Sequence, residues 1–120
     1  MIGSWFTRRG VRASFAAGTA ALDRGDSDLA LSWFGDAVRR DARFAPGHLG
    51  RGLARLRKCE FDAAVADLSE AIRLNGDPRA YFLRSLCYQG KGDRERERAD
   101  RAEALRRDPR VAHALHDPAA

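Results

Sequence analysis

Apolar residues recur at helical spacing through the middle of the chain. Leu49, Leu53 and Leu56 follow one another at intervals of four and three residues. This spacing places three side chains on one face of a helix. The pattern predicts one helix over residues 47–58 and a second over 62–74. No stretch alternates apolar and polar residues as a strand does, so the sequence predicts an all-α fold.

The pattern repeats when the chain is compared with itself at a shift near 34 residues. The matched positions of the first two units are, in chain order, Gly18, Ala30, Phe34 and Ala37, and then Gly52, Ala64, Leu68 and Ala71. In the third unit Ser85 stands at the position of the glycine. The period predicts an N-terminal arm, three repeats and a C-terminal tail over residues 1–10, 11–44, 45–77, 78–111 and 112–120.

Each repeat is expected to hold two helices joined by a tight turn. The turn positions are Gly25, Cys59 and Gly92. Glycine adopts a positive φ at little cost, which suits such a turn. The acidic residues that follow the three turns are Asp26, Glu60 and Asp93. They lie near the start of the second helix, where negative charge favours the positive end of the helix dipole.

The order of small and large residues resembles that of tetratricopeptide repeats over residues 11–111. Two helices approach to about 8–10 Å only where the residues in contact are small. Gly18 and Gly52 would therefore let Ala30 and Ala64 come close. The resemblance implies three antiparallel helical hairpins, stacked as a short right-handed superhelix, or α-solenoid.

The resemblance is incomplete in the third repeat. The aromatic residue near the end of the family's first helix is present as Tyr88, and the closing proline as Pro109. Glu97 and Arg101, however, stand where the family has an alanine and an aromatic residue. The last helix is therefore expected to be a solvated cap, which a finite stack requires.

The resemblance implies a protein–protein interaction scaffold that binds a peptide or protein segment on its concave face. The first helix of each hairpin lines this face, and the groove positions on this chain are Arg12, Phe15, Thr19, Leu22, Leu49, Leu53, Leu56, Arg57, Arg79, Phe82, Leu86 and Gln89. They are mostly apolar with arginines at intervals, which suits an acidic or amphipathic partner. Leu53 and Leu86 could equally pack between hairpins.

One binding mode of the family holds a C-terminal carboxylate with a clamp of Lys, Asn and Arg. The matching positions on this chain hold Phe15, Thr19, Gly50, Arg79 and Leu83. Only Arg79 could bind a carboxylate. The chain is therefore predicted not to be a clamp of this kind.

The chain carries 22 Lys and Arg residues against 17 Asp and Glu residues, a formal net charge of +5. Helical repeats can bind RNA, so a nucleic-acid-binding repeat with Arg-rich surfaces is the alternative function. The two signs are interleaved, however, and physiological salt screens charges beyond about 8 Å. Arg51 and Arg84 also share one phase of the repeat, which favours a role inside the hairpins. Nucleic acid is therefore the less favoured partner.

The sequence favours neither an enzyme nor a bound cofactor. His113 and His116 are spaced for one face of a helix, but no Asp, Glu or Cys completes a metal site with them. The segment Gly90-Lys91-Gly92 lacks the spacing of a phosphate-binding loop. We expect no catalytic residues and no metal.

Cys59 and Cys87 are the only cysteines, and they show no disulfide framework. We expect free thiols in a reducing compartment, which favours the cytoplasm. No apolar run reaches the ~20 residues of a membrane helix. Residues 7–22 resemble a twin-arginine export signal, but cleavage after them would remove half of the first repeat, so a helix of that repeat is favoured.

Trp5 and Phe6 are two large aromatic residues in the short N-terminal arm. Exposure of both to water would be unfavourable. We expect them to cover the open edge of the first hairpin. Alternatively, they could dock into the groove of another copy and form a homodimer.

Overall fold

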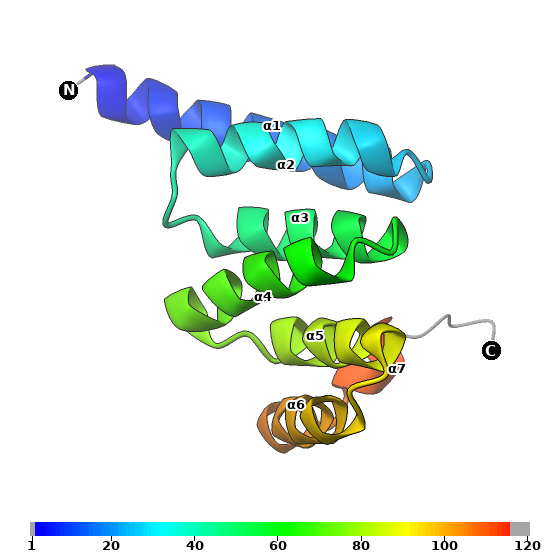
Figure 1. Ribbon diagram of the computed structural model, residues 1–120. Coiled ribbons are helices and arrows are strands. Elements are labelled where there is room, and N and C mark those ends of the chain that lie inside the picture. The colour runs from blue at the N-terminus through cyan, green and yellow to red at the C-terminus, as the bar shows by residue number, and fades with distance from the viewer. Residues whose placement is uncertain (1, 116–120) are drawn as a thin grey trace.

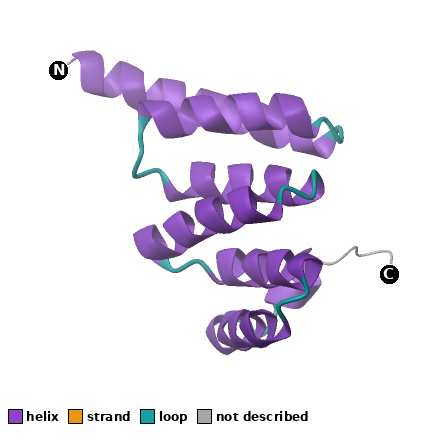
Figure 2. Ribbon diagram, viewed as in Figure 1, coloured by secondary structure: helices purple, strands orange, loops and turns teal. Residues whose placement is uncertain are grey.

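The computed structural model describes the backbone of residues 2–115 and the side chains of residues 8–113. Seven helices span the described part: α1 (Ile2–Asp23), α2 (Ser27–Arg40), α3 (Ala45–Arg57), α4 (Phe61–Asn75), α5 (Pro78–Lys91), α6 (Arg94–Arg107) and α7 (Val111–Leu115). Figure 1 shows three antiparallel pairs, α1–α2, α3–α4 and α5–α6, stacked one on the next. Figure 2 shows no strand in this part of the chain. The predicted all-α stack of three hairpins is confirmed.

The tight turns lie at the three predicted positions. Gly25, Cys59 and Gly92 have φ values of 77°, 59° and 77°. Cys59 is the only described residue other than glycine with a positive φ. The Cys59 side chain is exposed. The turn therefore depends on the positive φ of this residue and not on packing of its thiol.

The aspartates after the first and third turns cap the second helix of their hairpins with their side chains. The Asp26 carboxylate accepts a hydrogen bond from the Leu29 amide at 3.0 Å, and the Asp93 carboxylate accepts one from the Arg96 amide at 3.1 Å. Glu60 occupies the same position before α4 without a side-chain hydrogen bond to the helix. The shorter side chain of aspartate reaches the first amides of a helix, which explains its preference at this position.

Phe34 of α2 holds the first two hairpins together. Its side chain is 1% exposed. A Cβ atom added at Gly18 of α1 would lie 2.7 Å from this ring, and one added at Gly50 of α3 would lie 2.5 Å from it. The ring therefore fills a slot between two helices that carry no side chain there.

This contact differs in part from the expectation. Gly18 was expected to make room for Ala30, but it makes room for the ring of Phe34. Ala30 is fully buried in the same cluster. In the second hairpin, a Cβ added at Gly52 would lie 2.7 Å from Leu68, so the same pairing recurs with a smaller side chain. The small residues that recur in the repeats do permit close packing of the helices. At these contacts, however, each glycine packs against a large side chain and not against an alanine.

The N-terminal segment continues the first helix. Residues 1–10 were expected to form an arm, whereas α1 begins at Ile2 and runs to Asp23 without a break. The segment compared with an export signal belongs to this helix, whose later residues Val11 and Ala21 are buried. The side chains of Trp5 and Phe6 lie outside the described part, so their predicted roles stay predictions. None of the described helices has the length and apolar character that crossing a membrane requires.

Substitution of Gly50 by alanine tests the slot that holds Phe34. Alanine raises helix propensity by about 1 kcal/mol. Overpacking against the ring costs about 1–3 kcal/mol. We therefore expect Gly50→Ala to lower the free energy of unfolding in urea.

Gly35→Ala in α2 is the matched control. A Cβ there meets only the Arg39 guanidinium, at 3.4 Å, so the propensity gain of up to about 1 kcal/mol should appear as added stability. Equal effects of Gly50→Ala and Gly35→Ala would show that Phe34 does not need a bare backbone beside it.

Candidate interaction groove

A hollow of about 250 Å³ opens on the face formed by α1, α3 and α5. It is lined by Phe15, Thr19, Leu22, Asp23, Phe34, Pro46, Leu49, Gly50, Leu53, Arg57, Arg79 and Leu83. All of them except Phe34 and the residues of α3 come from the first helix of the first or third hairpin. We call this hollow the central groove.

Seven of the twelve predicted groove residues line the central groove, namely Phe15, Thr19, Leu22, Leu49, Leu53, Arg57 and Arg79. These seven positions, which the resemblance implied, therefore lie around one hollow, and their role in binding stays a prediction. Phe34 and Gly50 were not among the predicted residues. Because Gly50 has no side chain, the Phe34 ring packs against its backbone and borders the groove while staying buried. The pattern of apolar side chains along the sequence does not reveal a position such as Gly50, which shapes the groove by having no side chain.

The other five predicted residues lie elsewhere. Phe82 is 3% exposed and packs with Ala104 and Val111, so it belongs to the core beneath α7. Leu86 is partly buried against the same cluster. The remaining three also do not line the central groove. Arg12 is exposed on α1 and Gln89 is exposed on α5. Leu56 is partly buried against the core between the second and third hairpins. Phe82 does not line the groove because α7 packs over it. The repeat pattern in the sequence did not predict this helix.

The rim of the central groove carries charges of both signs. Arg57 donates a hydrogen bond from its guanidinium to the Leu22 carbonyl oxygen at 3.0 Å, which ties α3 to the end of α1. Arg79 forms an ion pair with Asp77 at 2.7 Å, and this hydrogen bond raises the pKa of Arg79. Asp23 contributes an exposed carboxylate from α1. The groove thus has a mainly apolar lining with charged side chains of both signs at its rim.

Arg51 holds the second hairpin together by binding a buried carboxylate. Asp67 is 4% exposed and accepts hydrogen bonds from Arg51 at 2.8 and 3.0 Å and from Arg55 at 2.7 Å. Both arginines come from α3 and the aspartate from α4. The ion pairs therefore join the two helices of one hairpin.

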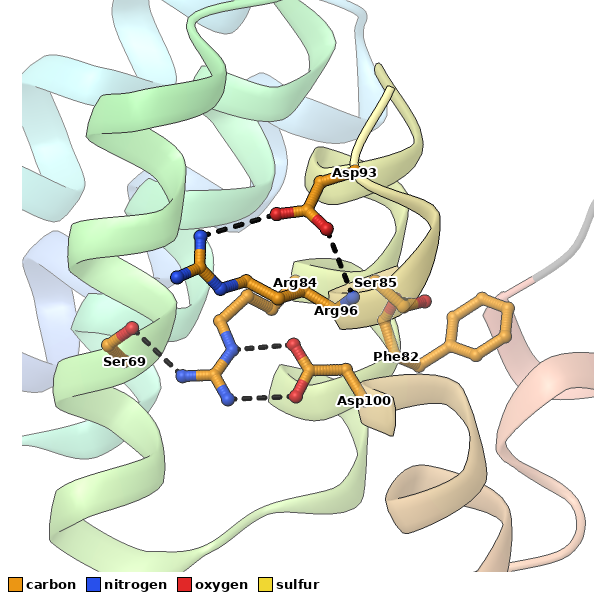
Figure 3. Close-up of polar contacts among 7 residues, drawn as sticks. All are labelled: Ser69, Phe82, Arg84, Ser85, Asp93, Arg96 and Asp100. Atoms are coloured by element: carbon orange, nitrogen blue, oxygen red, sulfur yellow. Dashed lines mark hydrogen bonds and ion pairs between the residues drawn. The ribbon is translucent and has the colours of Figure 1, made fainter. Parts of the chain in front are cut away.

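Arg84 repeats this arrangement in the third hairpin. Its guanidinium donates to both oxygens of Asp100, at 2.7 and 2.8 Å, and to the Ser69 hydroxyl oxygen at 3.0 Å, as Figure 3 shows. The predicted structural role of Arg51 and Arg84 is confirmed. Their partners were not predicted, although Asp67 and Asp100 recur at the same interval of 33 residues as the two arginines.

Further arginines of the last hairpin lie over tyrosine rings. The guanidinium carbon of Arg107 is 4.8 Å from the centre of the Tyr81 ring, and that of Arg96 is 5.9 Å from the Tyr88 ring. Arg84 lies between the two rings, at 5.7 and 6.0 Å. Such contacts are attractive because the ring face carries negative charge density. These cations and rings satisfy one another inside the hairpin.

The cysteines are free thiols, as predicted. Cys59 is exposed, whereas Cys87 is fully buried in the core between the second and third hairpins. Burial raises the pKa of the Cys87 thiol to about 11. Because the thiolate is the nucleophile, Cys87 is unreactive in the folded protein.

The structure describes only one of the two histidines that the sequence places on one helix face. His113 lies in α7, and His116 lies outside the described residues. Among the residues that the structure describes, no three histidine, cysteine or acidic side chains are grouped as metal ligands.

Comparisons with solved structures identify the fold. The chain is similar to the TPR domain of Arabidopsis OM64, with a TM-score of 0.85 and 21% identity over 90% of this chain and 92% of that one. It is also similar to the second TPR domain of human RPAP3 in complex with the HSP70 peptide SGPTIEEVD, with a TM-score of 0.81 and 17% identity over 92% and 99% of the two chains. No family model and no curated protein matches the sequence.

A thermophilic TPR protein of Thermus thermophilus is more similar in sequence. It shares 34% identity over 77% of this chain, with a TM-score of 0.65, and this chain spans about half of its length, 51%. The stacked hairpins and the groove between them define a helical-repeat protein. Within that class, the chain has the fold of tetratricopeptide-repeat domains.

The buried ion pairs predict a difference between two carboxylate substitutions in α4. Asp67→Asn should lower the free energy of unfolding by about 1–3 kcal/mol, because Arg51 and Arg55 lose a buried charged acceptor. Glu70→Gln should change it much less, since the Glu70–Arg73 pair lies on the surface. Urea denaturation of the two variants measures both effects, and comparable losses would contradict a role of Asp67 in the hairpin.

We also predict that the two cysteine thiols differ in reactivity. In the folded protein, a disulfide reagent at neutral pH should modify Cys59 and leave Cys87 unmodified, because Cys87 is buried. In guanidinium chloride both should react. Absorbance titration and peptide mass mapping measure this, and rapid modification of Cys87 without denaturant would contradict the described core.

Proposed function

We propose that this protein is an interaction scaffold that binds a peptide or a segment of another protein in its central groove. The observation that carries the proposal is an apolar hollow enclosed by all three hairpins and flanked by arginines. Peptide-binding grooves combine apolar pockets for anchoring side chains with a few polar groups that set orientation. The groove has both features.

The apolar floor determines which partner residues fit. Phe15, Leu49 and Leu53 are each partly exposed within the groove. An apolar side chain of a partner would bury area against all three, and burial contributes roughly 25 cal/mol for each Å² removed from water. One or two such anchors would dominate the binding energy.

The charged rim favours acidic residues next to the anchor. Arg57 lies at the rim and makes no ion pair with any described residue, so its guanidinium keeps free donors for a carboxylate. Asp23 follows Leu22, whose carbonyl oxygen Arg57 binds, and its carboxylate favours a partner that also carries a cation. The proposed partner is therefore amphipathic, with an acidic residue close to its apolar anchor.

The similar domain of human RPAP3 supports the class of partner. Its solved structure contains a peptide with two adjacent glutamates, a valine and a terminal aspartate. The groove of this chain offers Arg79 alone at the positions of a carboxylate clamp, so we propose an internal segment of a partner and not a C-terminal tail. A cytoplasmic location fits the free thiols and belongs to this proposal.

Selection from a random peptide library, displayed on phage, tests the groove. Enriched peptides should share an apolar residue beside Asp or Glu. Thr19→Trp, which fills the hollow from an exposed position, and Arg57→Glu, which reverses a rim charge, should each weaken binding about tenfold, or 1.4 kcal/mol. Fluorescence anisotropy with a selected peptide measures the affinities.

Arg43→Glu is the control for net charge. Arg43 is exposed in the loop between α2 and α3 and does not line the groove. Its substitution should leave peptide affinity unchanged. Equal affinity of the wild type and Thr19→Trp would contradict the proposal. Selective binding of RNA with steep loss of affinity in added salt would instead favour the nucleic-acid alternative.

A further inference from the structure

A second hollow, of about 430 Å³, opens at the far end of the stack. It lies between the C-terminal end of α5 and the first half of α6, and its lining residues are Gln89, Gly92, Arg94, Glu97, Arg98 and Arg101. The three arginines follow one another at intervals of four and three residues, so they share one face of α6. We call this hollow the terminal pocket.

The register of the repeats shows what the terminal pocket replaces. The ion pairs Arg51–Asp67 and Arg84–Asp100 relate the second hairpin to the third by 33 residues. In this register the α6 residues of the pocket correspond to Phe61, Ala64, Val65 and Leu68 of α4. Those four apolar residues hold the third hairpin in place, packing with Leu83 and Cys87. The terminal pocket is therefore the face on which a further hairpin would dock, with charged residues in place of apolar ones.

The described cap covers only the neighbouring apolar surface. Val111 of α7 is 1% exposed and packs against Phe82 and Ala104. No described residue of α7 lines the terminal pocket. The apolar part of the end face is closed, and none of the α7 residues that the structure describes covers the basic part.

The charges in the terminal pocket are unbalanced. Glu97 is paired with Arg101 at 3.1 Å. Arg94 and Arg98 make no ion pair with any residue that the structure describes. Like charges four residues apart on a helix repel one another. The arginines of α6 outside the pocket do have acidic partners, in the pairs Arg96–Asp93, Arg106–Glu103 and Arg107–Glu103. An anion between Arg94 and Arg98 would remove the repulsion.

We infer that the terminal pocket is a second interaction surface, which binds an acidic segment of a partner polypeptide through its carboxylates. The planar guanidinium groups of Arg94 and Arg98 can each bind a carboxylate through two hydrogen bonds. The exposed Gln89 amide adds a donor on the opposite wall. An apolar helix does not fit, because it would bury these cations without partners.

The choice of polypeptide carboxylates over nucleic acid rests on the tyrosines. Single-stranded nucleic acid binds by base stacking on aromatic rings together with charge. No aromatic side chain is among the described residues that line the terminal pocket. Tyr81 and Tyr88 of the same hairpin are already engaged by Arg84, Arg96 and Arg107. A pocket that offers cations but no exposed aromatic ring fits a run of acidic residues better than it fits nucleic acid.

An NMR titration of the full chain with a hexaglutamate peptide at low ionic strength tests this inference. The largest amide shifts should fall within residues 89–101. The double variant Arg94→Gln/Arg98→Gln should weaken the apparent affinity about tenfold, because two uncompensated cations are lost. Hexaglutamine should cause no shifts. The thermal midpoint of the variant should equal or exceed that of the wild type, which shows that it folds.

Arg39→Gln/Arg106→Gln is the matched control. It removes the same net charge from two exposed guanidinium groups outside the pocket, with exposed fractions of 71% and 69%. Its affinity for hexaglutamate should stay within twofold of the wild type. Equal weakening by both double variants would overturn the inference in favour of a net-charge effect. Tighter binding of a uridine hexanucleotide than of hexaglutamate at the same residues would overturn it in favour of nucleic acid. Neither outcome depends on the central groove, which these variants leave intact.

Discussion

The first two hairpins depend on one steric constraint, the fit of a large side chain against the bare backbone of a glycine in a neighbouring helix. Phe34 meets Gly18 on one side and Gly50 on the other. The same ring borders the central groove from within the core. The contact that joins the first two hairpins therefore also shapes the groove that we propose as the binding surface.

Local chemistry explains why much of the fold was predictable. A positive φ at Gly25 and Gly92, an aspartate one residue later and a helical apolar period are properties of short segments. Each of them constrains the backbone wherever the segment lies in space. The lining of the central groove followed because side chains of one helix face stay together when the helices stack. Thr19, Leu49 and Arg57 are examples.

The features that were not predicted depend on which neighbour covers a residue. Phe82 matches the groove positions in phase but is buried, because the short helix α7 lies over it. Asp67 is 4% exposed, whereas most of the acidic residues that the structure describes are partly or fully exposed. Its burial is possible only because Arg51 and Arg55 reach it from the facing helix. The sequence reveals such an arginine–aspartate pair only when the arginine and the aspartate are both seen to recur at the same interval in two repeats.

The arginine content of the chain has a similar explanation. Arg51, Arg55 and Arg84 bind buried carboxylates inside hairpins, and Arg107 lies over a tyrosine ring. These cations are part of the packing and do not form a basic surface for polyanions. Net charge alone therefore overstates the attraction of this fold for nucleic acid.

The end of the stack poses a problem that charge can solve. Every hairpin of a solenoid presents a docking face for the next, and apolar faces at open ends lead to head-to-tail association without closure. In α6 the docking positions carry Arg94, Arg98 and Arg101, whose desolvation by another hairpin would be costly. The same change in residue type that disfavours docking of a further hairpin leaves cations in a hollow, which we propose as a surface for acidic partners. Termination and a second binding surface are then two consequences of one change in residue type.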